Sequence, residues 1–136
     1  MKYFLAKTDP ETYSIDDLER DQTTPWDGVA NAQAVAAIRQ MRPGDRVFIY
    51  HSRGISSVVG IAEVQSEPRD DPRNPKSAMV EMGFGARLEP PVSLAEIKQS
   101  GKFDDWALVR QGRLSTMAAP AQFAAWMRQR YPKAKI

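Results

Sequence analysis

The 136-residue chain has no cysteine, one histidine and no long apolar run. Without cysteine there are no disulfides and no thiol chemistry, which is typical of a protein of the reducing cytoplasm. One histidine and no cysteine provide few of the three or four ligands that a zinc site needs. No apolar stretch has the length that spans a bilayer, and the start, Met1–Lys7, is too short for a signal peptide. We therefore expect a cytoplasmic protein with no metal and no membrane contact.

The usual enzyme motifs are also missing. The chain has no phosphate-binding Walker loop, no dinucleotide fingerprint and no serine elbow, so no cofactor is predicted. His51 is the only obvious acid–base candidate, and no nucleophile or orienting acid can be identified for it. Two interpretations of His51 stay open: a hydrogen-bonded residue at the rim of a core, or a polar group at the mouth of a small barrel. We predict that the protein is not an enzyme.

The composition is that of one globular domain covering residues 1–136. Hydrophobic residues make up 42% and charged residues 26% of the chain, and the net charge is only +2. The charges are uneven, because acids dominate residues 9–27 and all charged residues in the segment 128–135 are basic. Twelve arginines exceed seven lysines, and the planar arginine fork suits phosphate and base recognition. This pattern is compatible with modest nucleic-acid affinity or with an ordinary solvated surface.

Hydrophobic periodicity predicts a small, strongly bent mixed sheet with short helices packed on it. Strands are predicted over residues 3–7, 45–52, 55–65 and from 79 to Pro90-Pro91. Helices are predicted after the capping residue Ser14, over 32–41, after the capping residue Ser93 and from Pro120 onward. Residues 67–76 are predicted as an exposed loop and 103–115 as irregular. Gly60, Gly83 and Gly85 are predicted as points of curvature or close backbone approach.

The stretch from Trp26 to Asn31 has no periodicity of its own. Gly28 permits a tight turn, and Asn31 is a preferred residue type for the start of the following helix. An aromatic side chain is thereby placed beside a helix N-terminus, where free N–H groups favour electron-rich ligands. On spacing alone, Trp26 as a plug of the core is the favoured interpretation. Arg110 and Arg113 are likewise either a grip for a phosphate or base edge, or a pair of solvated side chains.

Six segments follow one another along the chain: Tyr3–Pro10, Tyr13–Leu18, Trp26–Ala34, Gly44–Ser52, Gly60–Val64 and Leu108–Ser115. Their order identifies a protein family more specifically than any single segment does. Together they resemble the EVE domain, a member of the PUA-like superfamily and a relative of the YTH readers of methylated adenine in RNA. The resemblance implies a PUA-like pseudobarrel of about five to six curved mixed strands with short helices around it.

The resemblance also implies a non-catalytic pocket for a flipped, modified base, such as methylated or hydroxymethylated cytosine in DNA, or a modified RNA base. The nucleic acid would be the partner. The residues that the resemblance and the residue patterns assign to base or ligand binding are Lys7, Thr8, Trp26, Gly28, Val29, Asn31, Tyr50, His51, Ser52, Arg110, Arg113, Leu114 and Ser115.

The chain departs from the family pattern at several positions. Thr8 and Asp9 stand where the family usually has serine and glutamate, and Ala30 and Val35 stand where it often has arginine. Fewer cations beside the pocket predict a weaker phosphate grip. Two alternatives therefore stay open: an RNA- or nucleotide-processing enzyme that uses His51, and a nucleoside or small-molecule sensor. The sequence does not indicate an oligomeric state.

Overall fold

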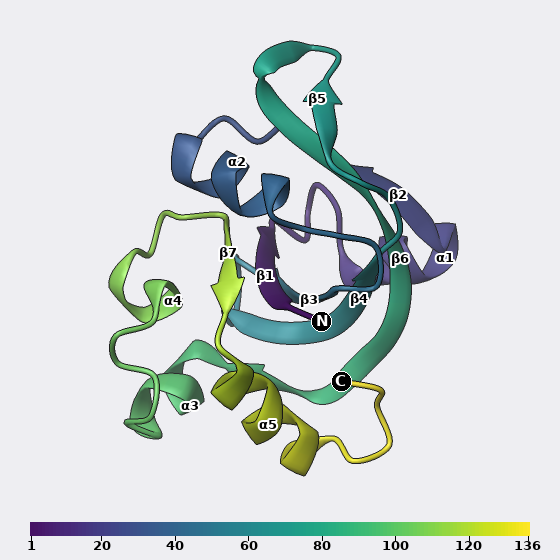
Figure 1. The fold of residues 1–136 in the computed structure, drawn as a ribbon. Coiled ribbons are helices and arrows are strands. Elements are labelled where there is room, and N and C mark those ends of the chain that lie inside the picture. Colours follow the sequence, from purple (N-terminus) through teal and green to yellow (C-terminus); the bar gives the residue numbers. More distant parts are fainter.

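The computed structural model describes residues 1–136 as seven strands and five helices (Figure 1). In chain order these are β1 (Tyr3–Thr8), α1 (Ile15–Asp21), β2 (Thr23–Trp26), α2 (Ala32–Arg39), β3 (Arg46–His51), β4 (Ser57–Val64), β5 (Arg69–Asp71), β6 (Asn74–Ser93), α3 (Leu94–Gln99), α4 (Ala107–Arg110), β7 (Thr116–Ala119) and α5 (Ala121–Arg130). The predicted mixed α/β class is confirmed, with more strands than the five to six expected. None of the helices is long and apolar enough to cross a membrane.

The sheet is a curled ribbon that does not close. Its strands follow the order β2-β6-β4-β3-β1-β7, and β5 forms a hairpin with β6 alone. Only β1 and β3 pair in parallel; all other pairs are antiparallel. β6 is long and bends around the other strands (Figure 1). β2 and β7 are therefore the two free ends of the path.

Each face of the sheet carries its own apolar core, as the alternation in β3 predicts. Val47 and Ile49 belong to one cluster with residues of α1 and α2, which we call the α1–α2 core. Phe48 and Tyr50 belong to the other with residues of α3, α4 and α5, which we call the α3–α5 core. Phe123 of α5 is fully buried and makes edge-on contacts with Phe48, with ring centroids 5.1 Å apart.

β6 contributes to both cores because it changes face near Gly85. Val80 and Met82 pack in the α1–α2 core, whereas Leu88 and Val92 pack in the α3–α5 core. The register with β4 shifts between Ile61 and Ala62, at the same place. A Cβ at Gly85 would lie 2.7 Å from the carbonyl oxygen of Ile61, so the two backbones approach more closely than a side chain allows.

The prediction that Pro90-Pro91 ends this strand is wrong. β6 continues to Ser93, and its pairing with β4 resumes at Val92, opposite Val58. The two prolines fall between paired positions, where no ladder hydrogen bond from their nitrogens is needed.

Four short elements were not predicted. β5 and the start of β6 lie in residues 67–76, which were expected to be loop, and α4 lies in the segment 103–115 that was expected to be irregular. β2 and β7 are edge strands of four residues each, too short for alternation to reveal. Pro25 is accommodated in β2 because only one side of an edge strand is paired.

The predicted helix starts at Ser14 and Ser93 are confirmed. Ser14 Oγ accepts a hydrogen bond from the N–H of Asp17, and the Asp17 carboxylate accepts one from the N–H of Ser14. Ser93 Oγ accepts from the N–H of Glu96 at the start of α3. These caps satisfy N–H groups that the first turn of a helix leaves free.

The approach of Gly85 to Ile61 gives a first prediction. Gly85→Ala places a methyl group against a backbone carbonyl, so we expect the free energy of unfolding to fall by about 1–3 kcal/mol. Gly112→Ala is the matched control, because no atom lies within 4 Å of a Cβ built there. Denaturant unfolding measures both; equal stability of the two variants would contradict the close approach.

Candidate functional site

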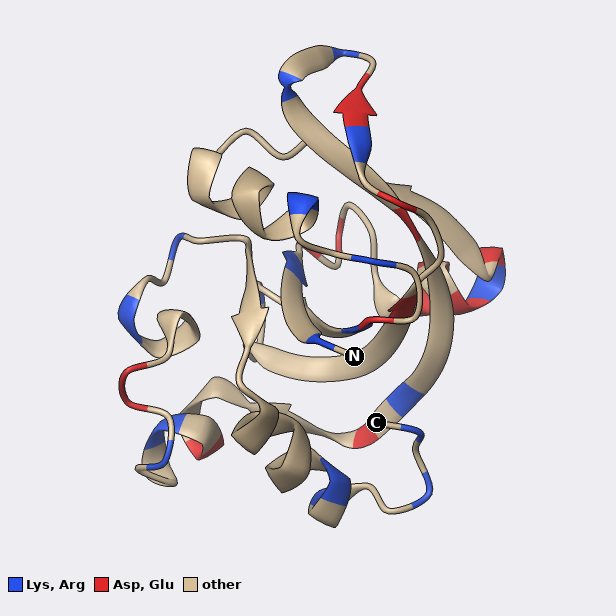
Figure 2. Ribbon diagram, viewed as in Figure 1, with Lys and Arg blue, Asp and Glu red and all other residues tan.

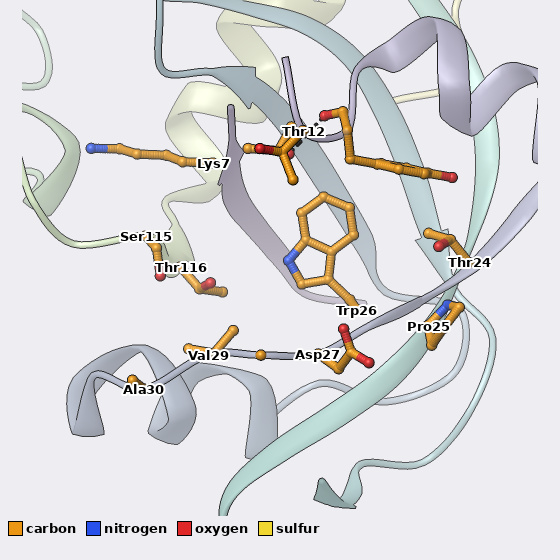
Figure 3. Close-up of a pocket in the computed structure, with 13 residues that line it drawn as sticks. Lys7, Thr12, Thr24, Pro25, Trp26, Asp27, Val29, Ala30, Ser115 and Thr116 are labelled. Atoms are coloured by element: carbon orange, nitrogen blue, oxygen red, sulfur yellow. Dashed lines mark hydrogen bonds between the residues drawn. The ribbon is translucent and has the colours of Figure 1, made fainter. Parts of the chain in front are cut away.

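A pocket of about 520 Å³ lies between the two free ends of the curled sheet. β2 supplies one wall, and the end of β1 with the start of β7 supplies the other (Figure 3). Its volume falls within the range of ligand-binding cavities. The lining residues are Lys7, Thr8, Thr12, Tyr13, Thr24, Pro25, Trp26, Asp27, Gly28, Val29, Ala30, Ser115 and Thr116.

Trp26 forms the aromatic wall of this pocket. It ends β2, pairs with Val80 of β6 and packs in the α1–α2 core, leaving 9% of its surface exposed. Figure 3 shows the indole extending across the pocket, with its nitrogen turned toward Ser115 and Thr116. The indole is thus both a packing residue and a pocket surface, so the two interpretations from the sequence are compatible.

The loop after Trp26 is braced by the β5–β6 hairpin. Gly28 has a φ of 75°, and its N–H donates to Oδ2 of Asp71 over 3.0 Å. Oδ1 of Asp71 accepts from the N–H of Arg73, and the Ser77 hydroxyl donates to the carbonyl of Val29. The hydrogen bonds from Arg73 and Gly28 hold the pKa of the Asp71 carboxyl below its usual value. The hairpin therefore fixes the loop that carries the aromatic wall.

Lys7 lines the pocket at the end of β1, but its ammonium group is turned away from Trp26 (Figure 3). Its Nζ donates to the carbonyl oxygen of Gly112 over 2.9 Å and lies 5.4 Å from the centre of the Tyr50 ring. Partial burial lowers the pKa of Lys7. The N–H of Lys7 also donates to the carbonyl of Ser115 over 2.8 Å, which aligns the end of β1 with the start of β7.

Six of the residues predicted for base or ligand binding line the pocket: Lys7, Thr8, Trp26, Gly28, Val29 and Ser115. The other seven do not. Tyr50 is 3% exposed and packs in the α3–α5 core behind Lys7, and Leu114 is 4% exposed in the same core.

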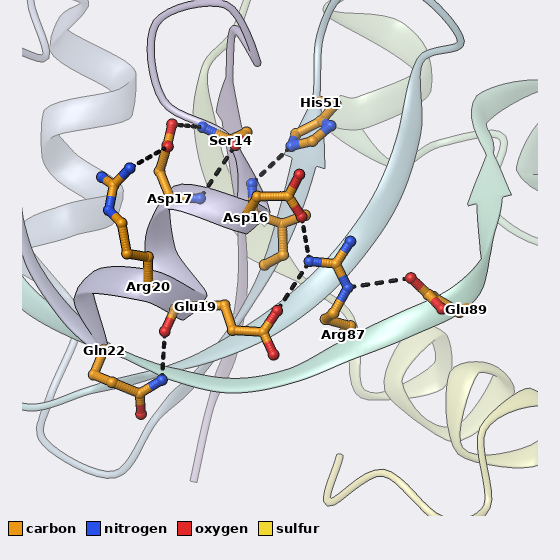
Figure 4. Close-up of polar contacts among 10 residues, drawn as sticks. Ser14, Asp16, Asp17, Glu19, Arg20, Gln22, His51, Arg87 and Glu89 are labelled. Carbon is orange, nitrogen blue, oxygen red and sulfur yellow. Dashed lines mark hydrogen bonds and ion pairs between the residues drawn. The ribbon is translucent and has the colours of Figure 1, made fainter.

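Three further predicted residues, His51, Asn31 and Ser52, make hydrogen bonds within the protein near the pocket. Nε2 of His51 accepts a hydrogen bond from the N–H of Ile15 over 3.1 Å, at the first residue of α1 (Figure 4). Burial is the main cause that lowers the pKa of His51, which favours the neutral form that can accept this bond. Asn31 Oδ1 caps α2 by accepting from Ala34, as predicted, and Ser52 donates to the carbonyl of Thr8.

The two arginines that flank Gly112 have different surroundings. Arg110 donates to the carboxylate of Asp105 and to the carbonyl of Asp104, each over 2.9 Å. Arg113 is exposed in the turn before β7. A joint grip on one phosphate is therefore not preformed, and Arg113 is the more available of the two.

Arg87 fixes α1 against β6 beside this site. Its guanidinium contacts carboxylates of Asp16 and Glu19 on α1 and of Glu89 on its own strand (Figure 4). These contacts raise the pKa of Arg87. Because His51 contacts the start of the same helix, α1 is anchored at its first turn by a neutral imidazole and along one side by a cation.

Seven lining residues were not predicted from the sequence: Thr12, Tyr13, Thr24, Pro25, Asp27, Ala30 and Thr116. Thr24, Pro25 and Thr116 lie in β2 and β7, the edge strands that were not predicted. Asp27 and Ala30 lie within the stretch from Trp26 to Asn31, so their closeness to Trp26 in the sequence could have indicated that they line the pocket. Thr12 precedes a capped helix and carried no signal of its own.

The chain matches a known protein family over almost its whole length. The family model for the EVE domain matches residues 2–130. Human thymocyte nuclear protein 1 is 33% identical over 124 residues, which cover 71% of this chain and 55% of that protein. The chain thus spans about half the length of this relative.

Solved structures share the fold. A protein from Rhodopseudomonas palustris superposes with a TM-score of 0.91 at 31% identity, covering 100% of this chain and 97% of that one. The human THYN1 protein in complex with 5-methylcytosine containing DNA superposes with a TM-score of 0.84 at 25% identity, covering 96% and 98%.

The contact between His51 and Ile15 predicts a pH dependence. The pKa of His51 is lower in the folded protein than in the unfolded chain, so the unfolded chain takes up the proton first as the pH falls. We expect its stabilising contribution to be complete above about pH 6.5 and to be lost as the pH falls through the lowered pKa. Thermal unfolding of the protein and of His51→Gln between pH 8 and 5 tests this. A constant difference between the two over that range would contradict it.

The hydrogen bonds of Asp71 also predict a contribution to stability that is lost as the pH falls. We expect Asp71→Asn to lower the melting temperature at pH 7 and to speed deuterium exchange of the Gly28 amide. The difference from the unaltered protein should shrink as the pH falls below about 4, where the unfolded carboxyl takes up its proton. Asp70→Asn is the control, because Asp70 is exposed and its carboxylate pairs with Arg39 on the surface. Equal deuterium exchange of the Gly28 amide in both variants would contradict the role of Asp71 in holding this loop.

Proposed function

The chain belongs to the EVE domain family, and from that premise we propose that it is a nucleic-acid-binding module that takes a flipped, modified base into the Trp26 pocket. The observation that carries this proposal is the pocket between β2 and β7, which places an aromatic wall opposite hydroxyl groups. Its relative, human THYN1, is seen in complex with 5-methylcytosine containing DNA. We propose methylated cytosine in DNA as the ligand of this chain too. A modified RNA base is the alternative ligand to be tested beside it.

The dimensions and chemistry of the pocket support a single base. A base stacked on an aromatic platform gains about 1–3 kcal/mol, which offsets much of the few kcal/mol that flipping costs. Trp26 offers such a platform, and Tyr13 lines the same pocket. We assign binding of the base to Lys7, Thr8, Trp26, Gly28, Val29 and Ser115, and a supporting role to Asn31, His51 and Ser52 through the segments that they hold.

The charges around the pocket support modest contact with a phosphate backbone. Cations lie on the segment between α4 and β7, where Arg113 is exposed, whereas acids crowd α1 (Figure 2). Ala30 provides no cation on the loop that follows Trp26. We therefore expect the affinity for DNA to fall only weakly with rising salt concentration, because few phosphates are neutralised.

The same charges favour a nucleoside sensor as the second candidate, because Arg110 is already paired with Asp105. Such a sensor would bind the free modified nucleoside with little dependence on salt. Catalysis by His51 receives less support. Its Nε2 accepts a hydrogen bond from the backbone of Ile15, and His51 does not line the pocket. The cytoplasmic location stays a prediction.

Replacing Trp26 tests the proposed function. We expect Trp26→Leu to weaken binding of a duplex with one 5-methylcytosine by about 1–3 kcal/mol, because the stacking surface is lost while an apolar side chain still fills the core. Trp26→Phe is the matched control and should keep most of the affinity. Fluorescence anisotropy with plain and methylated duplexes of one sequence, at two salt concentrations, measures the effect.

Two outcomes would contradict the proposal. One is equal affinity of the unaltered protein for plain and methylated duplexes and for their RNA counterparts. The other is unchanged affinity of a folded Trp26→Leu protein. Binding of the free nucleoside with no gain from the duplex would favour the sensor instead.

A further inference from the structure

The pocket wall contains a hydroxyl group that the protein itself does not use. Thr116 is 1% exposed, and its Oγ1 has no hydrogen-bond partner. Thr116 lies beside Ser115 on the side of the pocket toward which the Trp26 nitrogen is turned (Figure 3). A buried hydroxyl without a partner is unfavourable, and such groups in folded proteins call for an explanation.

The local structure does not require a hydroxyl at this position. Thr116 pairs with Ala6 across the β7–β1 ladder, and its neighbour Met117 faces the opposite side, into the α3–α5 core. Ala6 belongs to the α1–α2 core, so an apolar side chain such as valine would fit the face that Thr116 occupies. The hydroxyl therefore provides nothing to packing that a methyl group of the same size would not.

The other buried polar atom without a partner has an explanation of its own. It is Nε of Arg46, whose guanidinium is held by Glu63 through Nη1 over 3.3 Å. Thr116 Oγ1 is thus the one unpaired buried hydroxyl, and it belongs to a residue of the pocket wall.

We propose that the Thr116 hydroxyl is a base-binding group that hydrogen-bonds the polar edge of the bound base; this rests on the proposed function. A hydroxyl both donates and accepts, so it fits a ring nitrogen, a carbonyl or an amino group of a pyrimidine. The Trp26 N–H lies across the pocket as a further donor. The Thr116 hydroxyl thus bonds the edge that plain and methylated cytosine share, and not the added methyl group.

Thr116→Val tests the inference, since it replaces the hydroxyl by a methyl group of similar size. We expect the variant to melt at the same temperature as the unaltered protein or higher, because a buried unpaired hydroxyl is removed. We expect it to bind the methylated and the plain duplex more weakly by the same factor, about tenfold, so that the preference for methylation is unchanged. Thr116→Ser retains the hydroxyl and should bind nearly as the unaltered protein does.

A duplex with an abasic site in place of the cytosine completes the experiment, because it retains the phosphates and lacks the base edge. We expect Thr116→Val and the unaltered protein to bind it equally. A lower melting temperature of Thr116→Val would assign the hydroxyl to folding and overturn the inference. Unchanged affinity for the methylated duplex, or a loss confined to the methylated duplex, would overturn it as well.

The two proposals fail in different ways. If the unaltered protein binds none of the duplexes, the proposed function and the inference fall together. If it prefers the methylated duplex and Thr116→Val does so with equal affinity, the proposed function stands and only the assignment of Thr116 is lost.

Discussion

The close approach of Gly85 to the carbonyl of Ile61 is the constraint on which the rest of the structure depends. It lets β6 bend and change face, so one strand packs in the α1–α2 core with its first half and in the α3–α5 core with its second. The first half of β6 also holds β2, which ends at Trp26. The position of the aromatic wall is therefore set by a backbone contact in the middle of the sheet.

A sheet that curls without closing leaves two edges facing each other, and the pocket uses both. Edge strands have backbone and side-chain groups that no neighbouring strand satisfies. Here α2, capped by Asn31, follows the loop from β2, and the β5–β6 hairpin braces that loop through Asp71. The same incomplete closure that requires these braces provides a space large enough for one base, so the pocket is a consequence of the fold's topology.

Sequence reasoning recovered what regular alternation and capping encode. It predicted the faces of β3, the helix starts at Ser14 and Ser93, and the close approach in the middle of β4 and β6. It missed β2 and β7 because the pairing of a four-residue edge strand is decided by a distant partner, not by its own pattern. The candidate site was affected most, since its walls are these edges. Lys7, Trp26 and Ser115 were found through the family resemblance, whereas Thr116 gave no signal.

The polar residues near the pocket divide according to where their hydrogen bonds go. His51 accepts from Ile15, Asn31 caps α2 and Ser52 bonds to Thr8, so each has satisfied its side chain within the protein. A residue of this kind is costly to replace for reasons of folding, and its importance says little about a ligand. Thr116 is the reverse case: the fold bears the cost of its hydroxyl and gains no bond from it. A group that reads a base edge is best sought among those that the folded chain leaves unsatisfied, because such a group gains a partner when the ligand enters.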